Sequence, residues 1–209
     1  MKTKSDSLKI ARYDISESFE HININLKIAR LTVAVAECDH AYLECHEPKG
    51  YTYSVSVSDS VLTVCSIDKR CLFGRICAHA PEVTLYLPEK EYKALSVRLT
   101  TGKLSLNGIK AESLEIRNTT TKVWLTDTAI KECATVAVIT GKVCVTNMKC
   151  KRLAVRTGCG SVALDGVFAD ERIDVKTTTG SITLNNSDAP KSSFNATTGR
   201  IKGKLLSFD

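Results

Sequence analysis

Thiol and imidazole side chains gather in the first half of the chain and could bind a metal ion. The closest group in sequence is Cys38, His40, Cys45 and His46, and a looser group is Cys71, Cys77 and His79. Thiolate and imidazole are the ligands that zinc prefers. However, neither group has the paired Cys-x-x-Cys of a zinc knuckle, and free cysteine is common inside strands. We therefore predict neither a metal site nor a cofactor, and keep the first four residues as the candidates to check.

Carboxylates in the second half are the nearest approach to catalytic acid chemistry. They are Asp127, Asp165, Asp170, Glu171 and Asp174. Enzymes that cleave polysaccharides use pairs of such acids. Asp127 and Asp165, however, occupy turn positions, where Asp is expected for backbone reasons. The sequence also has no Gly-x-Ser-x-Gly elbow, P-loop or dinucleotide-binding glycine pattern. We expect no enzyme, and a carbohydrate-active enzyme ranks third among the interpretations.

Lysine and arginine recur at a fixed spacing in the second half. One series is Arg98, Arg117, Arg156 and Lys176, and the other is Lys103, Lys122, Lys142 and Arg200. Residues 95–209 hold 17 basic and 10 acidic residues, whereas residues 1–94 hold 12 and 13, within a total charge of +6. One interpretation of this clustering is a face for an anionic polymer such as an acidic glycan. The interpretation favoured at this point is a solvated strand surface whose like charges limit aggregation. No aromatic residues interleave to stack bases, which argues against nucleic acid.

The segments that carry these residues repeat along the chain. Six nine-residue segments align without gaps, and their third residues are spaced by 19 or 20: Gly102, Thr121, Gly141, Gly160, Gly180 and Gly199. Apolar residues alternate with polar ones on both sides of each anchor, as Val97, Leu104 and Leu106 do around Gly102. Period two with Thr-Gly and Asn-Gly turns is typical of strands. Each repeat is predicted to be strand, turn, strand, turn.

A repeat this short cannot bury its apolar face alone, so successive repeats must stack. We predict an all-β protein, a single-stranded parallel β-solenoid (β-helix) with about six regular coils of 19–20 residues. Residues 1–94 would form an irregular, β-rich N-terminal half, continuous in one domain with the regular repeats of residues 95–209. Strands are predicted there at 31–35, 42–45, 53–57, 61–66 and 83–87. We expect them to continue the column as longer, looser coils.

Outward positions of a solenoid stack into columns, which places the candidate binding residues. The two basic series fall four residues before and one residue after the anchors, so both should face solvent. Trp124, the only tryptophan, stands in a further outward column. An exposed tryptophan could anchor a sugar ring or a partner. A neighbouring loop, or the irregular half folding over it, would cover it instead.

A family resemblance rests on the step into the first regular coil. Leu87, Pro88 and Tyr92 lead to Thr101 and Gly102, and repeated TTG-x-I-x-L units follow. Over about residues 18 to 205 this layout resembles the bacterial putative-adhesin family, a β-solenoid domain of unknown function with LiaG-like members linked to cell-envelope stress. The resemblance implies an adhesin-like binding module and supplies no catalytic residues.

Composition and the N-terminal residues bear on location. At 43% hydrophobic and 25% charged residues the chain has the composition of a folded protein. No apolar run is long enough to span a membrane, and the start, MKTKSDSLKI, lacks the apolar stretch of a secretory signal. The odd number of cysteines, nine, fits free thiols in a reducing compartment. We expect a cytoplasmic protein, with cell-surface or envelope association as the alternative.

The C-terminal coil is degenerate, because Gly203 falls in a core column and few residues follow it. A bare terminal coil exposes unpaired backbone groups and needs a cap. Either Leu205, Leu206 and Phe208 fold over the end, or a second copy covers it and makes a homo-oligomer. Two interpretations stay open. One is a non-enzymatic binding module for an anionic glycan or protein partner, favoured by polar caps. The other is a structural, self-assembling protein like the bactofilin β-helices, favoured by an open hydrophobic end.

Overall fold

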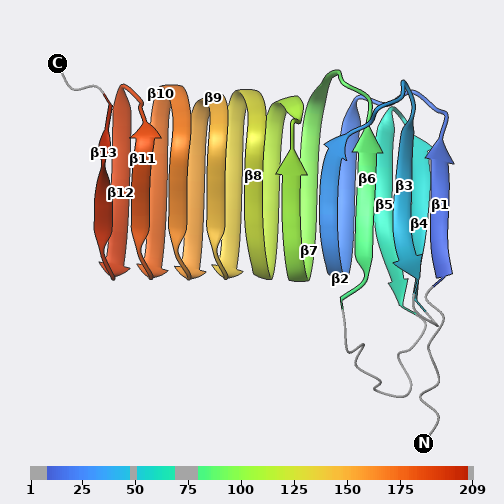
Figure 1. The fold of residues 1–209 in the computed structure, drawn as a ribbon, viewed down its shortest axis with the longest axis horizontal. Helices are drawn as coiled ribbons and strands as arrows, with labels where there is room; N and C mark the ends of the chain where they lie inside the picture. The colour runs from blue at the N-terminus through green and yellow to red at the C-terminus, as the bar shows by residue number, and fades with distance from the viewer. Residues whose placement is uncertain (1–8, 48–50, 69–79, 207–209) are drawn as a thin grey trace, which may run out of the picture.

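The computed structural model describes residues 9–47, 51–68 and 80–206, and within them every regular element is a strand. The regular half comprises β7 (Glu91–Asn107), β8 (Lys110–Thr140), β9 (Val143–Cys159), β10 (Val162–Thr179), β11 (Ile182–Ser187), β12 (Lys191–Thr198) and β13 (Ile201–Leu205). Each strand pairs in parallel with the strand one coil further on. Figure 1 shows the resulting column of coils. The predicted parallel β-solenoid is confirmed.

Strand register explains why the repeat alternates between two lengths. Leu95 pairs with Leu114, 19 residues on, and this offset holds throughout β7 and β8. Between β8 and β9 the register shifts from Ile130 to Cys133, and between β9 and β10 it shifts at Ala169. Each shift absorbs one additional residue as a local bulge. These two bulges lie at one corner of the solenoid, which we call the bulge corner, whereas a third register shift, between β11 and β13, lies between Leu184 and Ser187.

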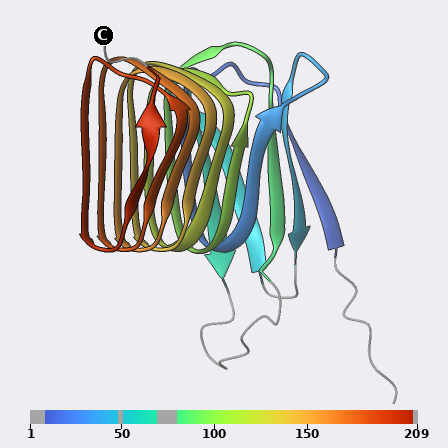
Figure 2. The same ribbon diagram turned by 60° about the vertical axis from the view of Figure 1, so that its left-hand side comes forward.

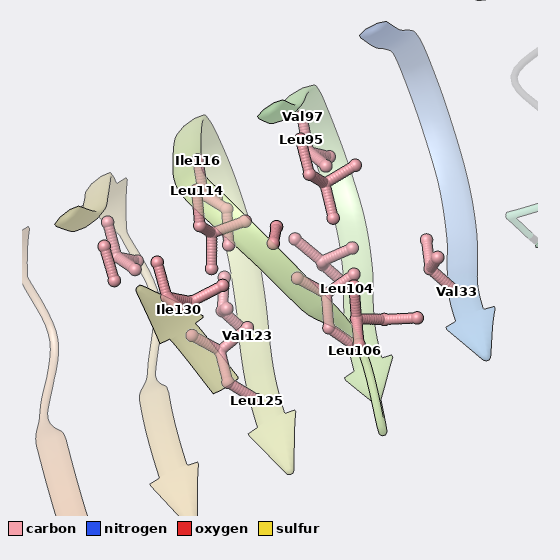
Figure 3. Close-up of a cluster of buried hydrophobic side chains, with 14 of the residues drawn as sticks. Val33, Leu95, Val97, Leu104, Leu106, Leu114, Ile116, Val123, Leu125 and Ile130 are labelled. Carbon is pink, nitrogen blue, oxygen red and sulfur yellow. The ribbon is translucent and has the colours of Figure 1, made fainter. Parts of the chain in front are cut away.

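The inward side chains form a continuous apolar core along the column. Leu104, Leu106, Val123 and Leu125 are fully buried and stack coil upon coil (Figure 3). Burying one such side chain stabilises the fold by about 1.5–3 kcal/mol. The pattern fails at the C-terminal end, where Ile201 is 47% exposed although it continues the same column. Figure 2 shows this last coil at the free end of the stack.

The N-terminal half continues the same sheet but ends in antiparallel strands. Its strands are β1 (Lys9–Ile15), β2 (His21–Val35), β3 (Ala41–Glu47), β4 (Tyr51–Ser58), β5 (Val61–Asp68) and β6 (Glu82–Leu87). All five predicted strands are present. β2 runs parallel to β7, and β5 and β6 run parallel to β2. The division at residue 94 stays a prediction.

The expectation of looser coils is wrong for β3 and β4, and β1 is an antiparallel strand outside the predicted set. β3 runs antiparallel to both β1 and β6, and β4 forms an antiparallel hairpin with β5. The hairpin turns at Asp59 and Ser60, whose φ values of 50° and 60° suit a type I′ turn. Because Asp-Ser is not the usual Asn-Gly signal, the reversal is hard to predict from the sequence.

No helix in the described ranges is long and apolar enough to cross a membrane.

The Leu-Pro-x-x-x-Tyr step has a structural role. Tyr92 is 1% exposed, and its ring stacks on Phe19 with centroids 5.9 Å apart. Its hydroxyl donates to the carbonyl of Pro88 at 3.0 Å, while burial raises the pKa of the phenol. Lys90 donates to the Phe19 carbonyl at 2.8 Å beside the same two rings. The step thus joins the irregular half to the first regular coil.

Candidate functional site

The two predicted basic series lie on either side of one corner, the Thr-Gly corner of each coil. In register, Arg98 pairs with Arg117, Arg156 with Lys176, and Lys103 with Lys122. We call the whole set the basic edge: Arg98, Arg117, Arg156, Lys176, Lys103, Lys122, Lys142 and Arg200. All eight side chains are exposed, as predicted from the repeat alignment. The basic edge therefore follows the solenoid axis along the regular half.

Most cations of the basic edge have no carboxylate partner in the part of the chain that the structure describes. Arg117 is held by Glu115, with Nη2 and Oε1 2.6 Å apart. None of the other seven forms an ion pair with a described residue. Like charges directly opposite one another on neighbouring strands are destabilising. The edge therefore carries uncompensated positive charge at some cost in stability.

Charges on and near the bulge corner are arranged in the opposite way. Lys110 contacts Glu89 at 2.8 Å, and Lys131 contacts Glu91 at 2.6 Å. Lys151 lies between two acids, 3.1 Å from Glu132 and 3.8 Å from Glu171. The hydrogen bond to Glu132 raises the pKa of Lys151, and the bond from Lys110 lowers that of Glu89. The fold thus pairs lysines with glutamates around the bulge corner. At the basic edge it leaves most cations without a carboxylate partner among the described residues.

A shallow groove of about 600 Å³ interrupts the basic edge between Arg117 and Lys176. Ala137 stands there in the outward column otherwise held by Arg117, Arg156 and Lys176. Next to it, Ile139 is 63% exposed and gives the groove an apolar surface. The alignment predicted the column, but the hollow made by its missing side chain became visible only in the fold.

Trp124 faces outward, as predicted, but is only half exposed. It lies in register between Ser105 and Cys144. The ammonium group of Lys103 sits over its ring, 4.5 Å from the centroid. A lysine of the basic edge therefore covers this tryptophan, rather than the loop or the N-terminal half that the sequence suggested. Because of this contact, the fluorescence of Trp124 can report on changes at the basic edge.

Sequence reasoning missed an aromatic cluster near the N-terminal end. Tyr42 and Tyr86 are paired in register and stack with centroids 4.5 Å apart. Arg12 covers the ring of Tyr42 at 3.9 Å and bonds to Asp14 at 2.9 Å. Burial raises the pKa of Tyr42. Alternation placed both tyrosines outward, but only the antiparallel pairing of β3 with β6 brings them together.

The four metal candidates do not converge. The Cys38 sulfur is 3.9 Å from Nε2 of His40. Cys45 is buried and donates to the Ala11 carbonyl, whereas His46 lies 3.6 Å from Glu82 on the other face. Adjacent strand residues point to opposite faces, which separates the pair. In the described part of the chain no three potential ligands group together. Cys71, Cys77 and His79 lie outside the described residues.

The five candidate acids are dispersed. Asp127 adopts the left-handed turn conformation, with φ of 51°, and accepts a bond from Asn147 at 3.0 Å. Asp165 accepts from Asn186 at 3.3 Å. Asp170 and Glu171 lie at the bulge corner, where Glu171 contacts Lys151 and Arg152. Asp174 lies just beyond this corner and pairs with Arg172. Their contacts within the described residues are those of turns and surface ion pairs.

Comparisons with known proteins agree with this architecture. The family model described as Toastrack DUF4097 matches residues 19–205. A putative cell adhesion protein from Clostridium sporogenes superposes with a TM-score of 0.54 at 15% identity, covering 94% of this chain and 100% of that one. A putative adhesin from Bacteroides fragilis gives 0.48 at 17% identity, covering 95% and 99%. The first likeness shows the fold. None of the curated proteins compared with the chain matches it.

Proposed function

The chain belongs to the Toastrack DUF4097 family, and we propose that it is a non-enzymatic binding module whose basic edge binds an anionic polymer. An acidic glycan is the ligand that we favour, and an acidic segment of a protein partner shares the same chemistry. The description of its Clostridium sporogenes neighbour as a cell adhesion protein supports binding rather than catalysis. The same description favours the cell envelope, the alternative location, over the cytoplasm that the sequence predicts.

The proposal rests on one contrast within the molecule. Lysines at the bulge corner are paired with glutamates, whereas those of the basic edge lack carboxylate partners among the described residues. An external polyanion would supply the missing partners. Coils are spaced by about 4.8 Å, so an extended polymer along the edge would meet a cation in nearly every coil. Such a ligand would relieve the repulsion within both columns.

Charge-neutralising variants test this proposal. The edge variant is Arg98→Gln, Arg156→Gln, Lys176→Gln, and its matched control is Lys110→Gln, Lys131→Gln, Lys151→Gln. Both remove three positive charges from the chain. At about 0.5–1 kcal/mol for each exposed ionic contact, the edge variant should bind polygalacturonate about tenfold to a hundredfold more weakly. The control should stay within about twofold of wild type. Equal losses in both would mean that bulk charge alone drives binding and would refute the proposed site.

Self-assembly through the C-terminal coil is a second candidate, because this end is partly apolar. Ile201 is 47% and Leu206 57% exposed, and Leu205 is only half-buried. Phe208 lies outside the described residues. The basic residues of the same coil oppose pairing of two identical edges: Lys191, Arg200, Lys202 and Lys204. We therefore rank assembly below ligand binding.

Sedimentation velocity over a wide concentration range tests the assembly proposal. A homo-oligomer through the C-terminal coil predicts larger species as concentration rises, more so at high salt, which screens the lysines. The double variant Ile201→Ser, Leu206→Ser should then lower the mass. An unchanged monomer mass at every concentration and salt would rule assembly out.

A further inference from the structure

We propose that the groove at Ala137 and Ile139 is a subsite for a single-chain anionic amphiphile, such as an alkyl phosphate monomer. This inference rests on the proposed function, because the groove borrows cations from the basic edge. It adds a second ligand chemistry, a charged head joined to an apolar chain, which a uniform polyanion does not have.

The apolar part of the groove arises where one stretch of the repeat departs from its neighbours. Ala137 replaces a basic side chain, and Gly158 leaves the adjoining position empty. Ile139 stands where the equivalent positions in other coils carry an exposed threonine: Thr100, Thr119, Thr178 and Thr197. The three departures adjoin one another and open a hollow of about 600 Å³. That volume lies within the range of about 300–1,000 Å³ typical of small-molecule sites.

Free positive charge lies at only one end of the groove. Arg156 and Lys176 are direct register partners on neighbouring coils, and neither pairs with a carboxylate in the described ranges. At the other end Glu115 neutralises Arg117. An anionic head would therefore sit between Arg156 and Lys176. The chain would extend from there over Ala137 and Ile139.

A buried amide lies at the neutral end of the groove, next to Arg117. Asn118 is 5% exposed and lines the groove, and its Oδ1 accepts the backbone N–H of Leu99 at 2.8 Å. Its Nδ2 has no hydrogen-bond partner among the described residues. In the later coils the equivalent Thr157 and Thr177 bond to each other at 2.9 Å. An unsatisfied buried donor costs stability, and Asn118 lies at the Arg117 end, away from the place of the anionic head between Arg156 and Lys176.

Calorimetric titration with dodecyl phosphate, kept below its micelle concentration, tests the subsite. Two variants restore features of the other coils: Ile139→Thr removes the apolar surface, and Ala137→Arg fills the hollow. Both positions face outward, so both variants should melt near the wild-type temperature. Each should weaken dodecyl phosphate binding at least tenfold. In wild type, dodecyl maltoside, with the same chain and a neutral head, should bind at least tenfold more weakly than the phosphate.

Several outcomes would overturn the subsite. These are no binding of monomeric dodecyl phosphate, equal affinity for the neutral detergent, or variants that bind like wild type. Binding only to phosphatidylglycerol vesicles, and not to the monomer, would also overturn it. Polygalacturonate separates this inference from the proposed function, since Ile139→Thr should bind it within twofold of wild type. If wild type binds dodecyl phosphate but no polygalacturonate, the proposed function fails and the subsite stands.

Discussion

Replacing Gly180 with alanine should destabilise the Thr-Gly corner that positions the basic edge. A Cβ at Gly180 would lie 2.0 Å from the carbonyl oxygen of Gly160 in the preceding coil. That atom is backbone and cannot rotate away. Gly180 also has φ of 148°, a conformation that residues with a side chain rarely adopt. The alanine can be accommodated only if the two coils move apart.

The expected loss can be estimated from two contributions. Holding a non-glycine residue in such a sparsely populated conformation costs about 1–3 kcal/mol. Separating the coils weakens the bond between them, from Gly160 N–H to the Thr179 carbonyl, and the shift of Gly180 weakens its own N–H bond to the Thr198 carbonyl of the next coil, both 2.8 Å. Each is worth about 1 kcal/mol. The free energy of unfolding should therefore fall by about 3–5 kcal/mol, a large part of the about 5–15 kcal/mol typical of a domain.

Urea unfolding followed by circular dichroism measures this loss, with Gly108→Asn as the matched control. Gly108 has φ of 70°, and asparagine already adopts this conformation at the equivalent Asn147, where φ is 52°. The control should cost less than about 1 kcal/mol, since its Cβ meets only a valine methyl at 3.1 Å. The reasoning is refuted if Gly180→Ala unfolds within 1 kcal/mol of wild type, or if both variants lose equal stability.

Three further predictions concern side chains. Burial raises the pKa of Cys150 to about 12, so at pH 8 iodoacetamide should label the exposed Cys159 orders of magnitude faster than Cys150. Equal labelling rates of the two thiols in peptide mapping would contradict the buried placement of Cys150. Lys103→Gln removes the ammonium over Trp124, so acrylamide should quench the single tryptophan more strongly; unchanged quenching would mean that the lysine does not shield the ring. The hydrogen bond from Lys110 lowers the pKa of Glu89, so the stabilising effect of this pair should be lost as pH falls below about 4.5. Glu89→Gln should flatten that part of the plot of melting temperature against pH, and an unchanged plot would argue against the Lys110–Glu89 pair.

The repeat made most of the fold predictable. Period-two apolar residues around each anchor, such as Leu104 and Leu106, define the buried face, and the 19–20-residue spacing defines the stacking. Because stacking aligns equivalent positions, the exposed columns of the basic edge followed from the same alignment. The order of the N-terminal strands did not, since local alternation says nothing about direction. The turn at Asp59 and Ser60 pairs β4 with β5 locally, but the place of this hairpin depends on the long-range pairing of β5 with β2.

The candidate site was predictable only in part. The sequence showed which residues are basic and outward, but not which of them find a carboxylate. Lys131 and Lys151 resemble the edge lysines in sequence, yet they pair with Glu91 and Glu132 across coils. The groove was missed for a related reason. Ala137 looks like a gap in a column, and only stacking places Gly158 and Ile139 beside it.

Lysine footprinting by amine acetylation and mass spectrometry, with and without polygalacturonate, tests the central claim most directly. The edge set is Lys103, Lys122, Lys142 and Lys176, and the reference set is Lys110, Lys131 and Lys151. If the basic edge is the binding site, ligand should slow acetylation of the edge set severalfold and leave the reference set unchanged. Protection of the reference set, or equal protection of both, would contradict the account.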